Sequence, residues 1–364
     1  MPDQMPTSDF HKKPFDEGTL TKLSIFELYT QEWVPVFVSQ PQPKFEEVHI
    51  FDFFSGPGTD SNGVYGSPLR IIDQLRRYHR KGMAGWVKAR IVVYLSDEDK
   101  QKIEQLKSIL EQPEWKIPGV QVDCRPMTFR EALKAHNVQL SNPRIAKLLI
   151  IDQCGVDEVS DDVFKKLIQF PTTDFIFFLS SSTLNRFRDH PAIKQKIQRP
   201  GDSYHVHREA FKYYQNLIPD GDQVFLGQFS IKKRGNIYGL IFGSRHPLGI
   251  HKFLQVAWAN DEIAGEANFD IEREKLSRSE MVLPFDLMRP NKIREFESDL
   301  ETALRNGKMK TEADVVRFCI ESGMTSRHST TVLKRLKAEG VIQIDFQVPD
   351  VRQLKSPRPI HLTG

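Results

Sequence analysis

The sequence predicts an α/β protein with a doubly wound, Rossmann-like sheet that ends in an antiparallel hairpin, followed by a small winged helix-turn-helix domain. Apolar runs alternate with helical patterns from residue 48 onward, which is typical of a mostly parallel sheet covered by helices on both faces. Two further β-patterned runs, 223–233 and 235–244, follow each other across a short turn containing Gly235. This spacing predicts a hairpin at the edge of the sheet.

The composition fits a globular protein of two or three domains. The chain has 364 residues, of which 39% are hydrophobic and 27% charged, so wholesale disorder is not expected. No apolar run reaches the ~18 residues of a membrane span, and residues 1–13 lack a signal-peptide core. We therefore expect a cytoplasmic protein without a membrane partner. The net charge of +3 does not by itself argue for nucleic acid.

Histidine and cysteine spacing predicts no metal site. Cys124, Cys154 and Cys319 lie far apart, which favours three reduced thiols over a disulfide framework or a metal cluster.

Residues 1–47 are expected to form a helical extension that packs on the core. Leu23, Phe26 and Trp33 recur at helical spacing, so the stretch 14–37 reads as an amphipathic helix ahead of the first strand.

Residues 48–262 are expected to form the Rossmann-like domain. The expected strands are 48–54, 89–95, 119–124, 146–152 and 174–179, and helices are expected at 68–80, 103–110, 128–135, 159–169, 190–217 and 248–262. Ser67 and Pro68 suit the N-cap and first turn of the first of these helices. A sheet of this kind that closes with an antiparallel hairpin is the pattern of class I methyltransferases, whereas other Rossmann-like sheets usually end in parallel.

Residues 291–364 differ in character from the sheet domain, and the polar stretch 263–290 reads as a linker or docking arm. Helices are expected at 293–304, 311–322 and 325–339, then a strand at 341–346 and a Pro-rich return over 348–360. Thr311 is expected as an N-cap with Asp314 in the capping-box position. This order of elements is that of a winged helix-turn-helix.

The turn behind the first strand predicts a cofactor site. Gly56 and Gly58 would let the backbone approach a ligand closely, at the edge of the sheet where the carboxyl ends of parallel strands meet. Asp97 ends the second strand and could accept hydrogen bonds from both hydroxyls of a ribose, with Glu98 and Asp99 as register alternatives. The loop between Gly58 and Gly66 is longer than a dinucleotide-binding turn, which favours a cofactor without a pyrophosphate, namely S-adenosylmethionine.

Three further carboxylates are assigned to the same site. Asp52, inside the first strand, could accept from the cofactor amine or from loop amides; Asp123, at the expected end of strand three, would lie near the adenine. Asp152 ends strand four, where it would orient a methyl acceptor as the catalytic residue. The alternative for Asp97 and Asp152 is that each caps the following helix.

The helix 325–339 combines basic residues with Ser326, His328, Ser329, Thr330 and Thr331, a mixture that suits phosphate and base-edge contacts in a major groove. The alternative is that the domain docks a protein or a second copy. The residues expected to contact nucleic acid are Arg327, Lys334, Arg335 and Lys337 on the helix, and Arg352 and Lys355 in the wing.

Several motifs together resemble the three-Cys-motif partner family. They cover most of the chain and comprise PFDEGTLTKL at 14–23, FELY at 26–29, FDFFSGPG at 51–58, GSPLR at 66–70 and GEANFDI at 265–271. The resemblance implies a bacterial or phage protein with a methyltransferase-like Rossmann domain, a C-terminal winged helix and a neighbouring, cysteine-bearing partner protein. One motif departs: where the family tends to read Asp-Pro-aromatic-Gly after strand four, this chain has Asp152-Gln153-Cys154-Gly155.

Two hypotheses follow. The first is a methyltransferase that uses S-adenosylmethionine on or near nucleic acid, which the glycine turn and Asp97 favour. The second is a non-catalytic DNA-binding adaptor or sensor that recruits a partner enzyme, which the altered motif after strand four favours.

Overall fold

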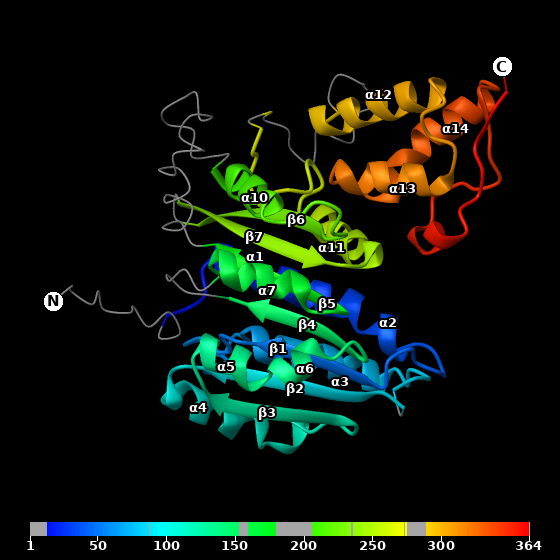
Figure 1. Ribbon diagram of the computed structural model, residues 1–364. Coiled ribbons are helices and arrows are strands. Elements are labelled where there is room, and N and C mark those ends of the chain that lie inside the picture. The colour runs from blue at the N-terminus through cyan, green and yellow to red at the C-terminus, as the bar shows by residue number, and fades with distance from the viewer. Residues whose placement is uncertain are drawn as a thin grey trace.

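The computed structural model describes residues 13–86, 88–152, 159–179, 206–233, 236–272, 274 and 289–363 (Figure 1). The strands of the main sheet are β1 (Glu47–Asp52), β2 (Arg90–Asp97), β3 (Val120–Pro126), β4 (Ile145–Ile151), β5 (Thr173–Leu179), β6 (Phe225–Lys233) and β7 (Asn236–Ser244). The helices of this part are α1 (Glu17–Trp33), α2 (Pro35–Val38), α3 (Ser67–Arg80), α4 (Lys100–Leu110), η2 (Pro113–Trp115), α5 (Phe129–Ala135), α6 (Asn137–Ser141), α7 (Asp161–Gln169), α10 (Val206–Asn216) and α11 (Pro247–Asn260).

The seven strands form one sheet in the order β3-β2-β1-β4-β5-β7-β6. The first five strands are parallel, while β7 runs antiparallel to both β5 and β6. The sheet therefore reverses strand order between β1 and β4 and closes with a hairpin. This is the expected class I methyltransferase-like arrangement, and the predicted fold of the sheet is confirmed.

Helices cover both faces of this sheet. One face packs against α1, α3, α4 and α11, with side chains such as Phe26, Leu75 and Phe253 in a single apolar cluster. The other face packs against α5, α6, α7 and α10, around Phe51, Phe164 and Phe177. The strands read as continuous apolar runs in the sequence because both of their faces are buried.

Helix α1 lies on the sheet ahead of β1, as its apolar spacing predicts. The Asp16 carboxylate caps its N-terminus by accepting from the Thr19 amide, and the helix packs against α3 and α11. Tyr29 is completely buried and donates a 2.7 Å hydrogen bond to Asp174 on β5. A polar contact inside the core thus fixes the helix over the sheet.

Several expected boundaries differ from the structure, two of them near the candidate site. Strand β3 continues past Cys124 to Pro126, which an edge strand permits because the outward side of proline needs no hydrogen bond. Helix α3 begins at Ser67 with Gly66 as its N-cap, so Ser67 is not the cap. The turn of the hairpin, 234–235, and the start of the expected helix 190–217 lie outside the described residues.

The C-terminal part contains α12 (Asn291–Arg305), α13 (Glu312–Glu321), η5 (Ser326–Ser329), α14 (Thr330–Ala338), β8 (Ile342–Gln343), η6 (Val351–Lys355) and β9 (His361–Leu362). Strands β8 and β9 pair antiparallel, so three helical segments are followed by a short two-stranded pairing, and the winged-helix assignment of this part stays a prediction. The predicted capping box of Thr311 and Asp314 is confirmed.

Two elements of this part are shorter than expected. The third helix is split into η5 and α14, and the His328 ring accepts from the Thr325 amide at 3.1 Å at the start of η5. The strand expected at 341–346 spans only Ile342–Gln343.

The segment 261–272 is an ordered extension of the sheet domain. It runs along the outer side of edge strand β6, where the Ser230 amide donates to Glu266 O (2.6 Å) and the Asn268 amide donates to Ser230 O (3.1 Å). In Figure 1 the C-terminal helices lie beyond α11, and α13 and η6 contact that helix. No helix in the described part of the chain is both long and apolar enough to cross a membrane.

Candidate cofactor site

The glycine turn and the acid that ends β2 meet at the carboxyl edge of the sheet. Strand β1 ends at Asp52, and the turn that follows brings Gly56 within 3.1 Å of Asp97: the Gly56 amide donates to Asp97 Oδ2. Gly56 has a φ of +59°, a conformation that favours glycine. The backbone of Ser55 also donates to Ser96 O at 2.9 Å. The two segments predicted to form one site are therefore in direct contact.

Asp97 also organises the turn behind β2. Its Oδ1 accepts from the Asp99 amide at 3.0 Å, and Asp99 in turn caps α4 by accepting from the Gln101 amide at 2.8 Å. Asp99 therefore has the helix-capping role considered for this cluster, while Glu98 is exposed. Asp97 is half-buried, and each carboxylate oxygen has a second lone pair for a ligand hydroxyl.

The long loop from Gly58 to Gly66 is a compact excursion held by Asp60. The carboxylate of this nearly buried residue accepts from the Val64 amide at 2.9 Å and, through its other oxygen, from the Phe15 amide at 2.7 Å. The Gly66 amide closes the loop by donating to Gly58 O at 2.7 Å. Asp60 therefore connects the glycine turn to the residues that precede α1.

Gly58 serves packing in this arrangement. Its φ is +95°, and a Cβ placed there would lie 2.9 Å from Leu106 Cδ1 and 3.3 Å from Leu69 Cδ1. Only glycine lets the turn lie flat on α3 and α4. The predicted contact of Gly58 with a cofactor stays a prediction.

Asp52 is completely buried at the end of β1. Its Oδ1 accepts from the Phe54 amide at 3.2 Å, so of the two partners considered for it the structure contains the loop amide. Among the described residues its Oδ2 has no hydrogen-bond partner. Burial raises the pKa of Asp52 to about 7; Ser67 and the Phe54 amide oppose the increase, and the charges of Asp152 and Asp97 add to it.

Asp152 follows β4 and is ion-paired with a residue from the start of the chain. Lys22 Nζ, on α1, lies 2.6 Å from Asp152 Oδ1, and the two side chains are 10% and 12% exposed. The ammonium also lies 4.6 Å from the centre of the Phe178 ring, a cation–π arrangement. The predicted catalytic acid is thus held by α1, while the altered motif residues 153–155 lie outside the described part of the chain.

Asp123 does not join the other carboxylates, because it is not at the end of its strand. Its register partner on β2 is Tyr94, three residues before Asp97, and its Oδ1 accepts from Arg125 Nε at 2.7 Å. The placement of Asp123 at a strand end was wrong because β3 is longer than the apolar pattern indicates. The backbone beside Asp97 belongs to Met127, whose amide donates to Asp97 O at 3.1 Å.

Sequence reasoning missed Lys22, Asp60 and Met127 as neighbours of the site. The Asp60-Ser-Asn-Gly stretch is a turn signature that could have identified Asp60, since a short acidic side chain commonly accepts from amides two residues on. Nothing in the local pattern of α1 distinguishes Lys22 from an ordinary surface lysine, because its partner is 130 residues away.

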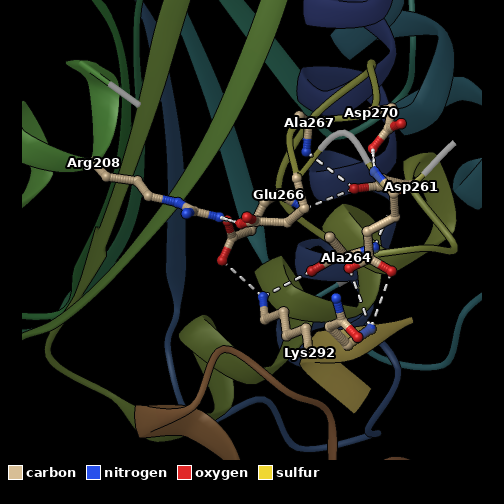
Figure 2. A network of polar contacts seen from close by, with 10 residues as sticks. Arg208, Asp261, Ala264, Glu266, Ala267, Asp270 and Lys292 are labelled. Carbon is tan, nitrogen blue, oxygen red and sulfur yellow. Dashed lines mark hydrogen bonds and ion pairs between the residues drawn. The ribbon is translucent and has the colours of Figure 1, made fainter. Parts of the chain in front are cut away.

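The segment 261–272 forms a second polar network, between the sheet domain and α12 (Figure 2). Glu266 forms ion pairs with Arg208 of α10 at 2.7 Å and with Lys292 of α12 at 2.8 Å. Burial opposes ionisation of Glu266, but the charges and hydrogen bonds of Lys292 and Arg208 outweigh it and lower its pKa to about 2. Asp261 accepts from the Ile263, Ala264, Glu266 and Ala267 amides and shapes the turn.

The polar residues proposed to read bases are largely covered. Ser326 and Ser329 are buried, and the His328 ring lies 4.2 Å from the Trp258 ring of α11. The Trp258 indole also donates to Gly323 O at 3.0 Å. The buried Ser326 and Ser329 are therefore not available to a major groove, because α11 packs against the start of the third helix, whereas Thr331 is exposed.

The basic residues predicted to contact nucleic acid are exposed, with different partners. Arg327 and Lys334 face solvent, whereas Arg335 is paired with Glu301. Lys337 Nζ donates to Ile344 O at 2.9 Å. These four residues therefore differ in how freely they could reach a phosphate.

The wing is held against the rest of the molecule. Val351 of η6 is buried in the core that includes α11 and α13. Arg352 is 77% exposed and pairs with Asp350 at 3.1 Å, and Lys355 is exposed. The wing therefore presents its basic residues beside α11 rather than on a free hairpin.

No protein-family model and no curated protein matches the sequence. Among solved structures, the chain is similar to a putative methyltransferase, yhhF, from Escherichia coli, with 12% identity over 63% of this chain and 86% of that chain and a TM-score of 0.31. It is also similar to the O-methyltransferase TomG from Streptomyces achromogenes in complex with S-adenosylmethionine, with 12% identity over 64% and 90% of the chains and a TM-score of 0.32. At these values the fold assignment rests on strand order and pairing.

Proposed function

We propose that this protein is a methyltransferase that uses S-adenosylmethionine. The contact between the Gly56 amide and Asp97 carries the proposal, because it joins the glycine turn after β1 to the acid that ends β2 in a sheet of class I methyltransferase order. In doubly wound sheets, ligands bind outside the carboxyl ends of strands where the strand order reverses. Here the reversal falls between β1 and β4, beside these two residues.

The described residues fit such a cofactor on chemical grounds. Asp97 offers carboxylate lone pairs at the edge of the sheet, suited to two ribose hydroxyls. Asp52 supplies a buried carboxyl oxygen without a partner among the described residues, a feature suited to a nearby cation. The cofactor would supply an activated methyl group, and the protein's part would be to position the acceptor near Asp152, since positioning is the main source of acceleration in such a displacement.

Isothermal titration with S-adenosylhomocysteine tests the proposal. We expect the intact protein to bind, and Asp97→Ala to abolish detectable binding because the ribose loses its acceptor. Glu98→Gln is the matched control: it removes the neighbouring exposed carboxylate and should leave affinity unchanged. Absence of binding by the intact protein would overturn the proposal, and equal binding by Asp97→Ala would overturn the role of Asp97.

We further propose that methylation takes place on or near nucleic acid, with a cysteine-bearing partner protein of the kind that the family resemblance implies. The exposed Arg327 and Lys334 support phosphate contacts. Because the start of the third helix is covered by α11, contacts from this helix would go mainly to the phosphate backbone. In a mobility-shift titration, the double variant Arg327→Ala with Lys334→Ala should bind nucleic acid more weakly, whatever its base sequence. The slope of the logarithm of the binding constant against the logarithm of the salt concentration should become smaller in magnitude by about 2. Lys88→Ala, an exposed lysine on the sheet domain, is the control.

The adaptor hypothesis has one observation in its favour. Lys22 pairs with Asp152 at 2.6 Å, so the carboxylate expected to orient an acceptor is already neutralised by α1. Transfer of a labelled methyl group to cellular DNA, RNA or protein distinguishes the two functions: labelling of any fraction supports the enzyme, and cofactor binding without labelling supports the adaptor.

A further inference from the structure

Three carboxyl groups from three strands come together at the carboxyl edge of the sheet. Asp52 ends β1, Asp97 ends β2 and Asp152 follows β4. Their carboxyl groups have different partners. Asp97 accepts hydrogen bonds from two backbone amides, and Asp152 is ion-paired with Lys22. Asp52 lies between these neighbours in strand order and has no cation opposite it among the described residues.

The unpartnered oxygen of Asp52 is the feature that points to a ligand. The residue is 0% exposed, and Oδ2 has no hydrogen-bond partner in the part of the chain that the structure describes. Leaving a buried carboxyl oxygen unsatisfied is unfavourable. Such a group is expected to be neutral when alone and to ionise when a positive charge is brought near.

We propose that Asp52 favours a cationic sulfonium cofactor over its neutral thioether product, because its buried carboxyl group releases a proton to solvent when the cation is bound and regains it when the thioether is bound. This inference rests on the proposed function. It assigns Asp52 a role in specificity through charge, without direct contact with the ligand.

The groups around Asp52 are consistent with this role. The charges of Asp97 and Asp152 disfavour its ionisation, while Ser67, at the start of α3, and the Phe54 amide favour it. Burial raises the pKa of the Cys124 thiol on β3 to about 11, and the charge of Asp52 contributes to the increase. Lys22 of α1 is ion-paired with Asp152, so its positive charge offsets the charge of Asp152 rather than that of Asp52. The influences that favour and disfavour ionisation of the Asp52 carboxyl group are therefore nearly balanced. One positive charge brought near it is enough to shift its ionisation.

The direction of the pH dependence follows from linkage. The pKa of Asp52 is about 7, so near that pH about half of the molecules carry the proton. A cation that favours the ionised carboxyl must bind more tightly as the pH rises, whereas a neutral ligand has no such dependence on Asp52. The affinity for S-adenosylmethionine relative to S-adenosylhomocysteine should therefore increase several-fold from about pH 6 to pH 8.

Calorimetric proton counting tests the inference. Both ligands are titrated into the intact protein near pH 7, in buffers of different ionisation enthalpy. Both ligands carry the same amino and carboxylate groups, so the difference between them isolates the sulfonium charge. We expect S-adenosylmethionine to release up to about half a proton more than S-adenosylhomocysteine, and Asp52→Asn to remove that difference.

The outcomes separate the inference from the proposed function. Binding of both ligands with equal proton release would overturn the role of Asp52 and leave cofactor binding intact; binding of neither would overturn both. If Asp52→Asn does not fold, Ser67→Ala serves instead. It removes a hydroxyl group that favours ionisation of Asp52, so the proton difference should be largest at a higher pH than in the intact protein. An unchanged pH dependence of the proton difference would contradict the inference.

Discussion

Lys22 Nζ lies 2.6 Å from Asp152 Oδ1, with both side chains almost completely buried. The pair joins the first helix of the chain to the end of the fourth strand, at the edge of the sheet where the candidate site lies. It makes α1 part of that site rather than an external extension.

Replacing Lys22 with Met should destabilise the fold strongly. The substitution leaves the Asp152 charge buried without its cation, and breaking such a pair typically costs about 3–5 kcal/mol. The free energy of unfolding in urea measures the effect. Lys233→Met is the control, because Lys233 also holds α1, through Asp16 at 3.3 Å, but both partners are more exposed. That change should cost about 1 kcal/mol or less, and a larger loss than for Lys22→Met would contradict the prediction.

The stabilising contributions of Asp52 and Asp174 should be lost as the pH rises from about 4 to about 7. Burial raises the pKa of Asp52 to about 7 and that of Asp174 to about 6, the latter opposed by hydrogen bonds from Ser244, Tyr29 and Trp33. Between the ordinary value of 3.8 and these values the two carboxyl groups bind more protons in the folded protein than in the unfolded chain, so at these groups rising pH favours unfolding. Asp174→Asn should flatten the profile by on the order of 2 kcal/mol. Urea midpoints across this range measure it, and an unchanged slope would contradict it.

Gly58→Ala should destabilise the glycine turn more than Gly63→Ala. Both residues have positive φ, +95° and +76°, but a Cβ at Gly58 meets Leu106 at 2.9 Å whereas nothing lies within 4 Å of one at Gly63. Holding an alanine in the left-handed backbone conformation should cost about 1–2 kcal/mol at either position, and overpacking against the neighbouring side chains should add about 1–3 kcal/mol at Gly58 only. Thermal unfolding compares the two variants. Equal losses would mean that Gly58 does not pack against α4 as described.

Glu266→Gln should loosen the junction between the sheet domain and α12. Arg208 and Lys292 would lose the charge that they share (Figure 2), which we expect to cost about 2–4 kcal/mol. Because the pKa of Glu266 is lowered to about 2, its contribution is present above about pH 4.5 and is lost as the pH falls toward 2.

Hydrogen exchange measures the same change locally. Amides of α12 and of 261–272 should exchange faster in Glu266→Gln. Glu272→Gln is the control, since Glu272 also contacts Arg208 but is 37% exposed. Exchange that rises equally in both variants would argue against a central role for Glu266.

The sheet could be predicted largely from the sequence because its strands are buried on both faces and the helices between them are amphipathic. The pairing of the glycine turn with Asp97 followed from topology alone, since neighbouring parallel strands bring their carboxyl ends to one edge. Asp123 was misplaced because the exposed, charged end of β3 has no apolar pattern to mark it. A strand end at an edge is set by backbone pairing, which hydrophobicity does not report.

Contacts between distant segments were beyond sequence reasoning. The ion pair of Lys22 and Asp152, and the packing of Trp258 on His328, depend on how separate elements meet. Serines that look available for base contacts in the pattern 325–339 are buried for the same reason: the start of the helix faces α11, and no local signal distinguishes that face from a solvent-facing one.

The first helix also constrains how the chain can fold during synthesis. Helix α1 leaves the ribosome before its polar partners. Lys22, Thr19 and Glu32 contact Asp152, Lys233 and Lys252, which follow 130, 214 and 220 residues later along the chain. Until those residues emerge, the apolar face of α1 has no complete partner surface, a state that exposes nascent chains to aggregation. Chains interrupted before α11 would lack partners of this helix, so folding of the sheet domain should be completed only after α11 has been synthesised.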